Sequence, residues 1–189
     1  MADFHEEKAR ETIDHAKELV IDSLAETMDL YGVTRSAGTL YGTMYFEGDM
    51  TLDQMRDELG MSKPSMSTGV RKLQDFNVVK KTFKKGERKH TYVAERDFFK
   101  FFSNFFSKKW DREAALNLES IRHAQKELLE LSSQENLPES VKEEAKSVYT
   151  ILEESKPYYY WLQRLSASVK SGEIFDLIPF YPEDQDTNE

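Results

Sequence analysis

One segment, from residue 51 to residue 95, restricts the possible fold of this chain more than any other. Residues 51–59 carry apolar side chains at helical spacing, which predicts a short helix. Gly60 follows where that helix should end, because glycine adopts the left-handed backbone conformation that closes a last turn. Ser62 is then a favourable N-cap for a second helix, and Pro64 suits the first turn of that helix. The pattern predicts two short helices joined by a tight turn.

A predicted β-hairpin follows the second helix. Residues 78–83 and 91–94 have the composition of strands, and the loop between them is polar and contains glycine. The second helix carries one apolar stripe, formed by Met66, Val70, Leu73 and Phe76. Its Lys, Arg, Ser and Thr side chains therefore face mostly outward. The order helix, turn, helix and hairpin predicts a winged helix-turn-helix. For the whole chain we expect a mainly α fold with a small β-wing and long helical dimerisation extensions.

Positive charge is concentrated in the same segment. Residues 62–90 contain nine Lys or Arg and two acids, a net charge of +7, whereas the whole chain carries −9 and the remainder therefore −16. A basic surface on an acidic protein indicates a site for a polyanion, where hydroxyls approach base edges and cations contact phosphates. The candidate DNA-binding residues are Ser62, Lys63, Ser65, Ser67, Thr68, Arg71 and Lys72 on the second helix, and Lys84, Lys85, Arg88 and Lys89 on the wing.

Helices are predicted on both sides of this segment. The expected regions are a dimerisation helix at 1–35, the winged domain at 36–96, a helical dimerisation and ligand-sensing region at 97–178, and a flexible tail at 179–189. Asp97 is a suitable N-cap for the long helix that follows the wing. Pro157 is expected to end one helix and to start another, because proline has no backbone N–H.

The composition argues against several classes of protein. The chain has no cysteine, so it has neither a disulfide framework nor a thiolate site. Its four histidines lack metal-ligand spacing, and its eight glycines form no phosphate-binding loop. The N-terminus is too acidic for a signal peptide, and no apolar run is long enough to cross a bilayer. We therefore expect a cytoplasmic protein that is not an enzyme, with no metal, cofactor or membrane partner.

Aromatic residues gather in three places, at residues 41–46, 98–110 and 158–161. Most of these rings are expected to form a core and a dimer interface. A minority could instead surround a quaternary ammonium ion, which donates no hydrogen bond but is attracted to the faces of aromatic rings. The candidate residues for such a ligand site are Tyr41, Tyr45, Phe102, Trp110, Tyr159 and Trp161.

Three stretches carry a resemblance to known proteins. They are DLYGVTRSAGTLYGTMYF at 29–46, MSKPSMSTGVRKLQDFNVVKKTF at 61–83, and RKHTYVAERDFFKFFSNFF at 88–106. The winged segment resembles the MarR-type transcription regulators, and the three stretches resemble the GbsR group of Bacillus-type bacteria. This resemblance implies a dimeric repressor of genes that convert choline to glycine betaine or import osmoprotectants, modulated by choline or a related quaternary amine. It also places the outward residues from Ser62 to Arg71 in the recognition helix of the family.

A dimeric regulator of this kind is expected to bind a double-stranded DNA operator with an imperfect palindrome. Two-fold symmetry would place two recognition helices about 34 Å apart, which is one turn of the duplex. Two alternatives remain open. One is a winged-helix regulator without a small-molecule ligand, in which the aromatic residues are purely structural. The other is a winged-helix protein-interaction module, whose apolar docking would not weaken with salt as phosphate contacts do.

Overall fold

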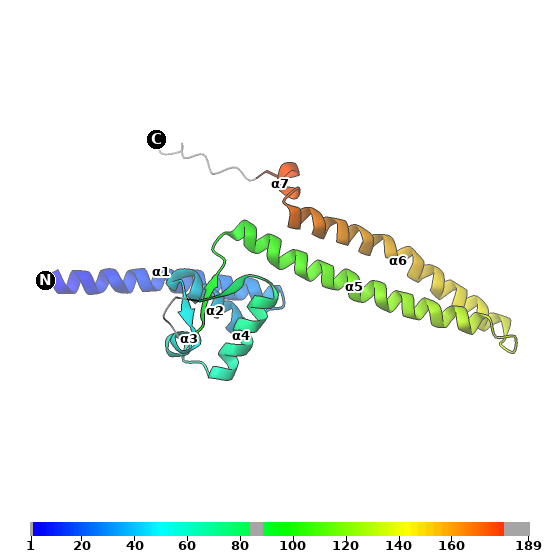
Figure 1. Cartoon of the computed structure of the whole chain (residues 1–189), viewed down its shortest axis with the longest axis horizontal. Helices are drawn as coiled ribbons and strands as arrows, with labels where there is room; N and C mark the ends of the chain where they lie inside the picture. The colour runs from blue at the N-terminus through cyan, green and yellow to red at the C-terminus, as the bar shows by residue number, and fades with distance from the viewer. Residues whose placement is uncertain (1, 84–88, 180–189) are drawn as a thin grey trace. The chain divides into compact units, whose positions relative to one another are not determined.

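The computed structural model describes residues 2–83 and 89–179 of the chain. It divides into two compact units, Met1–Phe101 and Phe102–Glu189. Helices form most of both units, and one small antiparallel sheet lies in the first unit (Figure 1). The mainly α fold class predicted from the sequence is therefore confirmed.

Two helices that cross at short distance form the base of the first unit. α1 (Ala2–Leu30) lies within the region 1–35 where a helix is predicted, and α2 (Arg35–Glu47) packs against it. A Cβ atom added at Gly38 would lie 2.7 Å from the Cα of Ala25, which is closer than real Cβ atoms come. Glycine at position 38 therefore allows the two backbones to pack directly on each other. The N-terminal half of α1 extends beyond the rest of the unit (Figure 1).

The predicted helix-turn-helix is formed by α3 (Leu52–Leu59) and α4 (Lys63–Asp75). Thr51 caps α3 through a capping box, in which two otherwise unpaired backbone N–H groups are satisfied. Gly60 ends α3 in the left-handed conformation, with a φ angle of 61°. Ser62 is the N-cap of α4, as predicted. The turn therefore follows from local residue preferences on both of its sides.

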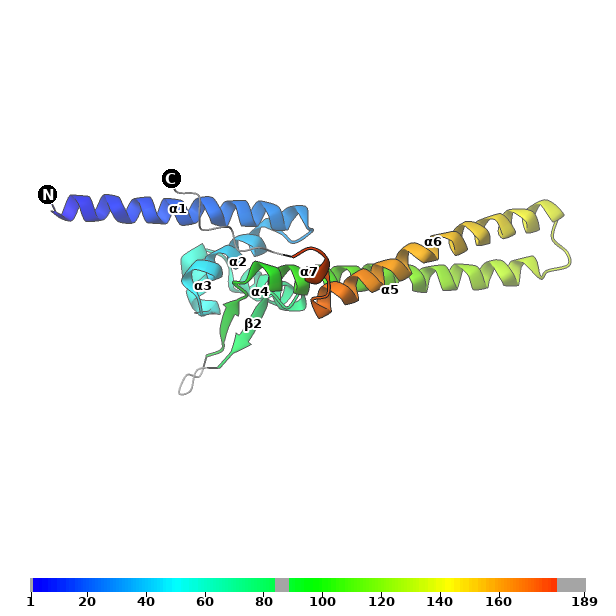
Figure 2. The ribbon, with the colours of Figure 1, turned by 90° about the horizontal axis from the view of Figure 1, so that it is seen from above.

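A three-stranded antiparallel sheet completes the first unit, in the order β1-β3-β2. β2 (Val79–Thr82) and β3 (Thr91–Ala94) are the two predicted strands, and Val79 lies opposite Ala94. β1 (Met50–Thr51) pairs with the other edge of β3 and was not predicted. A strand of two residues is too short to carry an alternating pattern. The β2–β3 hairpin projects away from α2 (Figure 2).

The core of the first unit joins α2, α3, α4 and the sheet. Its largest fully buried side chains are Met28 of α1, Val33 before α2, and Leu40, Tyr41, Met44, Met55, Met66, Val70, Leu73, Val78 and Val79. Three members of the stripe predicted for α4 are thus buried, and the fourth, Phe76, is half-buried at the helix end. Burying one such side chain stabilises the fold by about 1.5–3 kcal/mol, so this stripe fixes which face of α4 remains outward.

The second unit is an antiparallel hairpin of two long helices. α5 (Phe98–Ser132) starts in the first unit, and α6 (Glu139–Ser171) returns alongside it (Figure 1). The short α7 (Ile174–Leu177) follows α6. The apolar seam of the hairpin is formed by the buried side chains of Phe105, Ala114, Leu118, Ile121, Ala145, Leu162 and Val169.

Two polar links, each with a buried donor, set the register of this hairpin. Near its open end, the Ser166 hydroxyl lies 3.0 Å from the backbone carbonyl oxygen of Ser107 and 2.5 Å from a carboxylate oxygen of Asp111, and it can donate to either acceptor on α5. Closer to the connecting turn, the Gln125 amide donates to the Glu153 carboxylate at 2.8 Å. Ser166 is fully buried and Gln125 is 5% exposed, so either group would lose solvation without its partner. A shifted register would break both bonds.

The prediction that Pro157 separates two helices is wrong, because α6 continues through this residue. Proline removes one helical hydrogen bond, and its ring crowds the carbonyl group one turn earlier. That cost is local, whereas packing holds both sides of the proline in place. Ala145 is buried before it, and Leu162 and Ser166 are buried after it. Tertiary packing therefore outweighs the local preference of the proline.

Candidate nucleic-acid interface

The polar face of α4 lies opposite its buried stripe. Lys63, Ser65, Thr68 and Arg71 are exposed on this face, and Ser67 and Lys72 are half-buried. The fold thus gathers the predicted α4 residues on one solvent-facing surface. Lysine and arginine side chains can neutralise phosphates there, while short hydroxyl side chains can approach base edges.

Ser62 has a structural role beside any role in binding. Its Oγ accepts a hydrogen bond from the backbone N–H of Ser65 at 3.4 Å, and it lies 2.9 Å from the Ser65 Oγ. The cap holds the first turn of α4 in place. It also couples the two serine hydroxyls, so their positions at the start of the helix are defined together.

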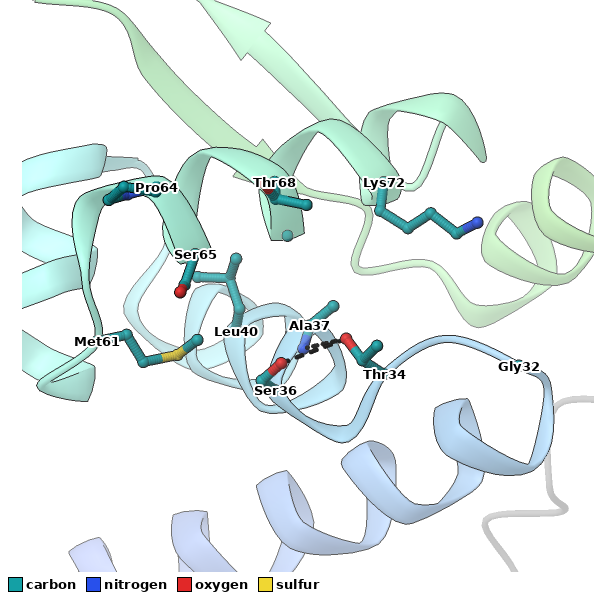
Figure 3. Close-up of a pocket in the computed structure, with 11 residues that line it drawn as sticks. Gly32, Thr34, Ser36, Ala37, Leu40, Met61, Pro64, Ser65, Thr68 and Lys72 are labelled. Atoms are coloured by element: carbon teal, nitrogen blue, oxygen red, sulfur yellow. Dashed lines mark hydrogen bonds between the residues drawn. The ribbon is translucent and has the colours of Figure 1, made fainter.

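A groove of about 580 Å³ lies between α4 and the start of α2 (Figure 3). Its polar lining consists of four hydroxyl side chains and one ammonium group, from Thr34, Ser36, Ser65, Thr68 and Lys72. Its apolar floor comes from Ala37, Leu40 and Met61. Hydroxyl donors beside an ammonium group can bind a phosphate oxygen.

Two residues of this groove were not predicted as part of the site. The sequence identifies Thr34 and Ser36 as possible helix caps, and Thr34 does accept a hydrogen bond from the Ala37 N–H at 3.4 Å. Their position beside α4 depends on how α2 packs against α4, because they precede α4 by more than one whole helix in the chain. In the sequence, Thr34 and Ser36 can be recognised only as Ser or Thr residues at the start of a helix. This pattern does not show that α4 lies beside them.

The described wing residue Lys89 is paired with an acid on α3. Its Nζ donates to the Asp53 carboxylate at 2.7 Å, and Arg56 lies 3.6 Å from the other oxygen of that carboxylate. The hydrogen bond from Lys89 lowers the pKa of Asp53. Lys89 thus joins the base of the wing to α3. The other predicted wing residues, Lys84, Lys85 and Arg88, lie outside the described residues.

The two ligand candidates on α2 differ in their accessibility. Tyr41 is fully buried, its ring packs 5.1 Å from that of Phe101, and its hydroxyl donates to the Glu95 carbonyl at 2.6 Å. Tyr45 is half-buried and stacks on Phe98 with ring centroids 5.3 Å apart. Burial raises the pKa of Tyr41, which keeps the hydroxyl a donor. Tyr41 is therefore a core residue of the first unit.

The four candidates in the second unit belong to two aromatic clusters. On α5, Phe102 lies 5.1 Å from Phe106 and 6.4 Å from Trp110, measured between ring centroids. On α6, Tyr158 lies 5.1 Å from Tyr159 and 6.2 Å from Trp161. Tyr158 and Trp161 are each about half exposed, at 51% and 49%. Both clusters contain rings that solvent can reach.

The α6 cluster also has an acid beside it. The Tyr158 hydroxyl donates to a carboxylate oxygen of Glu113 at 3.4 Å, and the negative charge of Glu113 raises the pKa of Tyr158. Two ring faces beside a carboxylate form a surface that attracts an organic cation. Glu113 was not predicted as a site residue, because nothing in the sequence links it to a position on another helix.

Two further properties follow from the coordinates of the described residues. Within residues 2–83 and 89–179, no three His, Asp or Glu side chains lie close enough together to hold a metal ion. In the same part of the chain, no helix combines the length and the apolar content that a bilayer-spanning segment requires.

The helix-turn-helix, the projecting hairpin and the polar face of α4 define a winged helix-turn-helix regulator as the class of protein. A family model described as "GbsR family transcriptional regulator, C-terminal helical hairpin" matches residues 98–176. The Bacillus subtilis (strain 168) HTH-type transcriptional repressor GbsR is 63% identical, with 88% of this chain and 93% of that protein covered. The chain belongs to the GbsR family of transcriptional regulators.

Two more distant similarities agree with this result. The HTH-type transcriptional repressor OpcR of Bacillus subtilis (strain 168) is 33% identical, with 90% of this chain and 93% of that protein covered. A crystal structure described as a transcriptional regulator matches with a TM-score of 0.50 and 16% identity, covering 80% of this chain and 99% of that one. The last similarity concerns the fold alone. All the named relatives are regulators and none is named as an enzyme.

Replacing Tyr41 by Phe should destabilise the first unit by about 1–2 kcal/mol, because the Glu95 carbonyl loses its buried donor. The unfolding midpoint in urea, followed by circular dichroism, measures this change. Tyr45→Phe is the matched control, since it removes a hydroxyl from a half-buried ring on the same helix. The raised pKa of Tyr41 adds a pH dependence with a defined sign. Wild-type stability should fall as the pH rises above about 10, where unfolded tyrosine ionises, and Tyr41→Phe should lack that component.

Proposed function

We propose that this protein is a homodimeric transcription repressor that binds a DNA operator with an imperfect palindrome and responds to choline or a related quaternary amine. The observation that carries the proposal is the exposed basic and hydroxyl-rich face of α4 in a chain of net charge −9. The likeness to proteins named as repressors supports the same conclusion. In this proposal the repressed genes serve glycine betaine synthesis or osmoprotectant uptake, and the protein acts in the cytoplasm.

The DNA contact is built from two kinds of group. Lys63 and Arg71 extend from the exposed face of α4 and are the candidates for base edges and phosphates. The groove beside α4 adds Thr34, Ser36 and Lys72, whose polar atoms suit the backbone of one strand. Acidic surfaces elsewhere on the chain repel the duplex and thereby favour this one orientation.

Replacing Lys63 or Arg71 by Ala should weaken DNA binding. If the side chain contacts a base, the expected loss is about 1–3 kcal/mol and depends on the DNA sequence. If it contacts a phosphate, the loss should be similar for all sequences and the salt slope should fall by about one. Fluorescence anisotropy at several salt concentrations, with a duplex selected by the wild-type protein from a random pool, measures both quantities. Lys146→Ala on α6 is the control, and wild-type binding by both variants would show that α4 is not the recognition helix.

The dimer proposal rests on apolar side chains that each unit leaves exposed. On α1, Ile13 is 57% exposed and Val20 is 43% exposed, and their spacing places them on one helix face. On α6, Val148 and Ile151 are 40% and 62% exposed. Apolar groups at helical spacing on long helices suit burial against a second copy of the chain. Two copies would also present two recognition helices to a palindrome.

Light scattering of the purified protein at micromolar concentration should give twice the 22.1 kDa mass of one chain. Replacing Ile13 and Val20 together by Glu should shift the protein towards monomers, because charges cannot be buried in an apolar interface without a large cost. Thr12→Glu adds a charge at an exposed polar position of the same helix and should leave the mass unchanged. A wild-type mass of one chain would contradict the dimer.

The ligand proposal is supported by the α6 cluster. The exposed faces of Tyr158 and Trp161 provide the π surface that a trimethylammonium group requires, and Glu113 adds a negative charge beside them. Cation–π contact with desolvated rings contributes about 2 kcal/mol or more. The α5 cluster with Phe102 and Trp110 is a second candidate, because it has the same ring chemistry. Ligand can alter DNA binding only as far as its affinity differs between the two states of the dimer.

Choline titrated into the protein should quench or shift tryptophan fluorescence, and calorimetry should give its affinity. Trp161→Ala and Glu113→Gln should each weaken choline binding if the α6 cluster is the site, whereas Trp110→Ala should weaken it if the α5 cluster is. Glycine betaine should bind the α6 cluster more weakly than choline, because its carboxylate meets Glu113. Tyr160→Ala removes another exposed ring from α6 and serves as the control. If all these variants stay folded and bind choline equally, neither cluster is the site.

A further inference from the structure

One exposed ring on the wing has no role in the core. Phe83 follows β2 directly, and 74% of its surface is exposed. Among the described residues from 31 to 97 it is the most exposed large hydrophobic side chain. A fully exposed phenylalanine forgoes about 1.5–3 kcal/mol of burial, so a partner that covered the Phe83 ring would gain part of this free energy.

The ring of Phe83 is held by its neighbours on the hairpin. The register that pairs Thr82 with Thr91 continues to Phe83 and His90, and their rings meet edge to face with centroids 4.8 Å apart. The Lys81 ammonium lies 5.8 Å from the Phe83 centroid. The ring is therefore oriented beside a cation, at the end of a strand that also carries the exposed Lys80.

We infer that Phe83 makes a direct apolar contact with a deoxyribose of the duplex when the wing meets the minor groove. The inference deepens the proposed DNA binding and rests on it. Aromatic ring faces carry partial negative charge and are repelled by phosphates, so the ring must meet the sugar between two phosphates. Lys81, which lies on the same strand face as Phe83, then contacts a neighbouring phosphate, and apolar side chains are known partners of the minor groove.

The charge of the segment that contains the ring favours DNA over a protein partner. Residues 62–90 carry a net charge of +7. A protein surface that covered Phe83 would have to bring acids to balance these cations, whereas DNA supplies a sugar and two phosphates in one repeating unit. The contact adds a component of affinity that does not depend on salt, in contrast to the lysines around it.

Binding of a mixed-sequence duplex, followed by anisotropy across a range of salt concentrations, tests this inference. Phe83→Ala should lower the affinity roughly tenfold, because it removes the apolar surface that the ring buries against the sugar, and it should leave the salt slope unchanged. Phe83→Leu keeps an apolar side chain and should retain most of the affinity. Lys81→Ala should lower the salt slope by about 0.9, as expected for one lost phosphate contact. Circular dichroism and light scattering establish that each variant keeps its fold and mass.

A position-specific crosslink provides the second measurement. p-Benzoylphenylalanine at position 83 should form a covalent adduct with the duplex on irradiation, and the same group at position 160 on α6 should not. Equal affinity of Phe83→Ala and wild type, together with no DNA adduct, would overturn the inference while the proposed DNA binding stands. An adduct with a second protein chain in place of DNA would also overturn it. If the wild-type protein shows no salt-dependent binding to the duplex, the proposed function itself is overturned.

Discussion

The close packing of α2 between α1 and α4 is the constraint on which the first unit depends. At Gly38 there is no room for a side chain, because the backbone of Ala25 lies where a Cβ would be. On the side towards α4, a Cβ at Gly69 would meet the Leu40 side chain at 3.2 Å. Gly38 thus lets α2 pack closely on α1, Gly69 lets α4 pack closely on α2, and the burial of Met66, Val70 and Leu73 fixes the rotation of α4. The polar groups of α4 that are proposed to contact DNA are oriented by this packing.

The distribution of charge along the chain is uneven. Positive charge is collected on α4 and the wing, whereas the rest of the chain is acidic. Within this surface Lys89 is not a free cation, because Asp53 on α3 holds it at 2.7 Å. The wing is thus tied to the helix-turn-helix by an ion pair as well as by the sheet. Surface ion pairs of this kind contribute little to stability, so the main effect of the Lys89–Asp53 pair is to position the base of the wing against α3.

The second unit uses a different principle, because a long helical hairpin offers little core to specify its alignment. Apolar seams allow neighbouring helices to slide by a turn at modest cost. The Ser166 bond to Ser107 and the Gln125 bond to Glu153 remove that freedom, since buried polar groups are costly without their partners. The same alignment brings Glu113 of α5 beside Tyr158 of α6 and so forms the proposed cation surface.

The sequence by itself determined the elements whose signals are local. The turn at Gly60, the cap at Ser62, the apolar stripe of α4 and the two wing strands follow from residue preferences that act within a few positions. Tertiary structure decided everything that depends on long-range packing. It carried α6 through Pro157, added β1 to the edge of β3, and placed Thr34 and Ser36 beside α4. A local preference costs or contributes a few kcal/mol at one position, whereas packing sums many contacts between residues far apart in the chain. A local sequence pattern therefore does not predict the result of this packing.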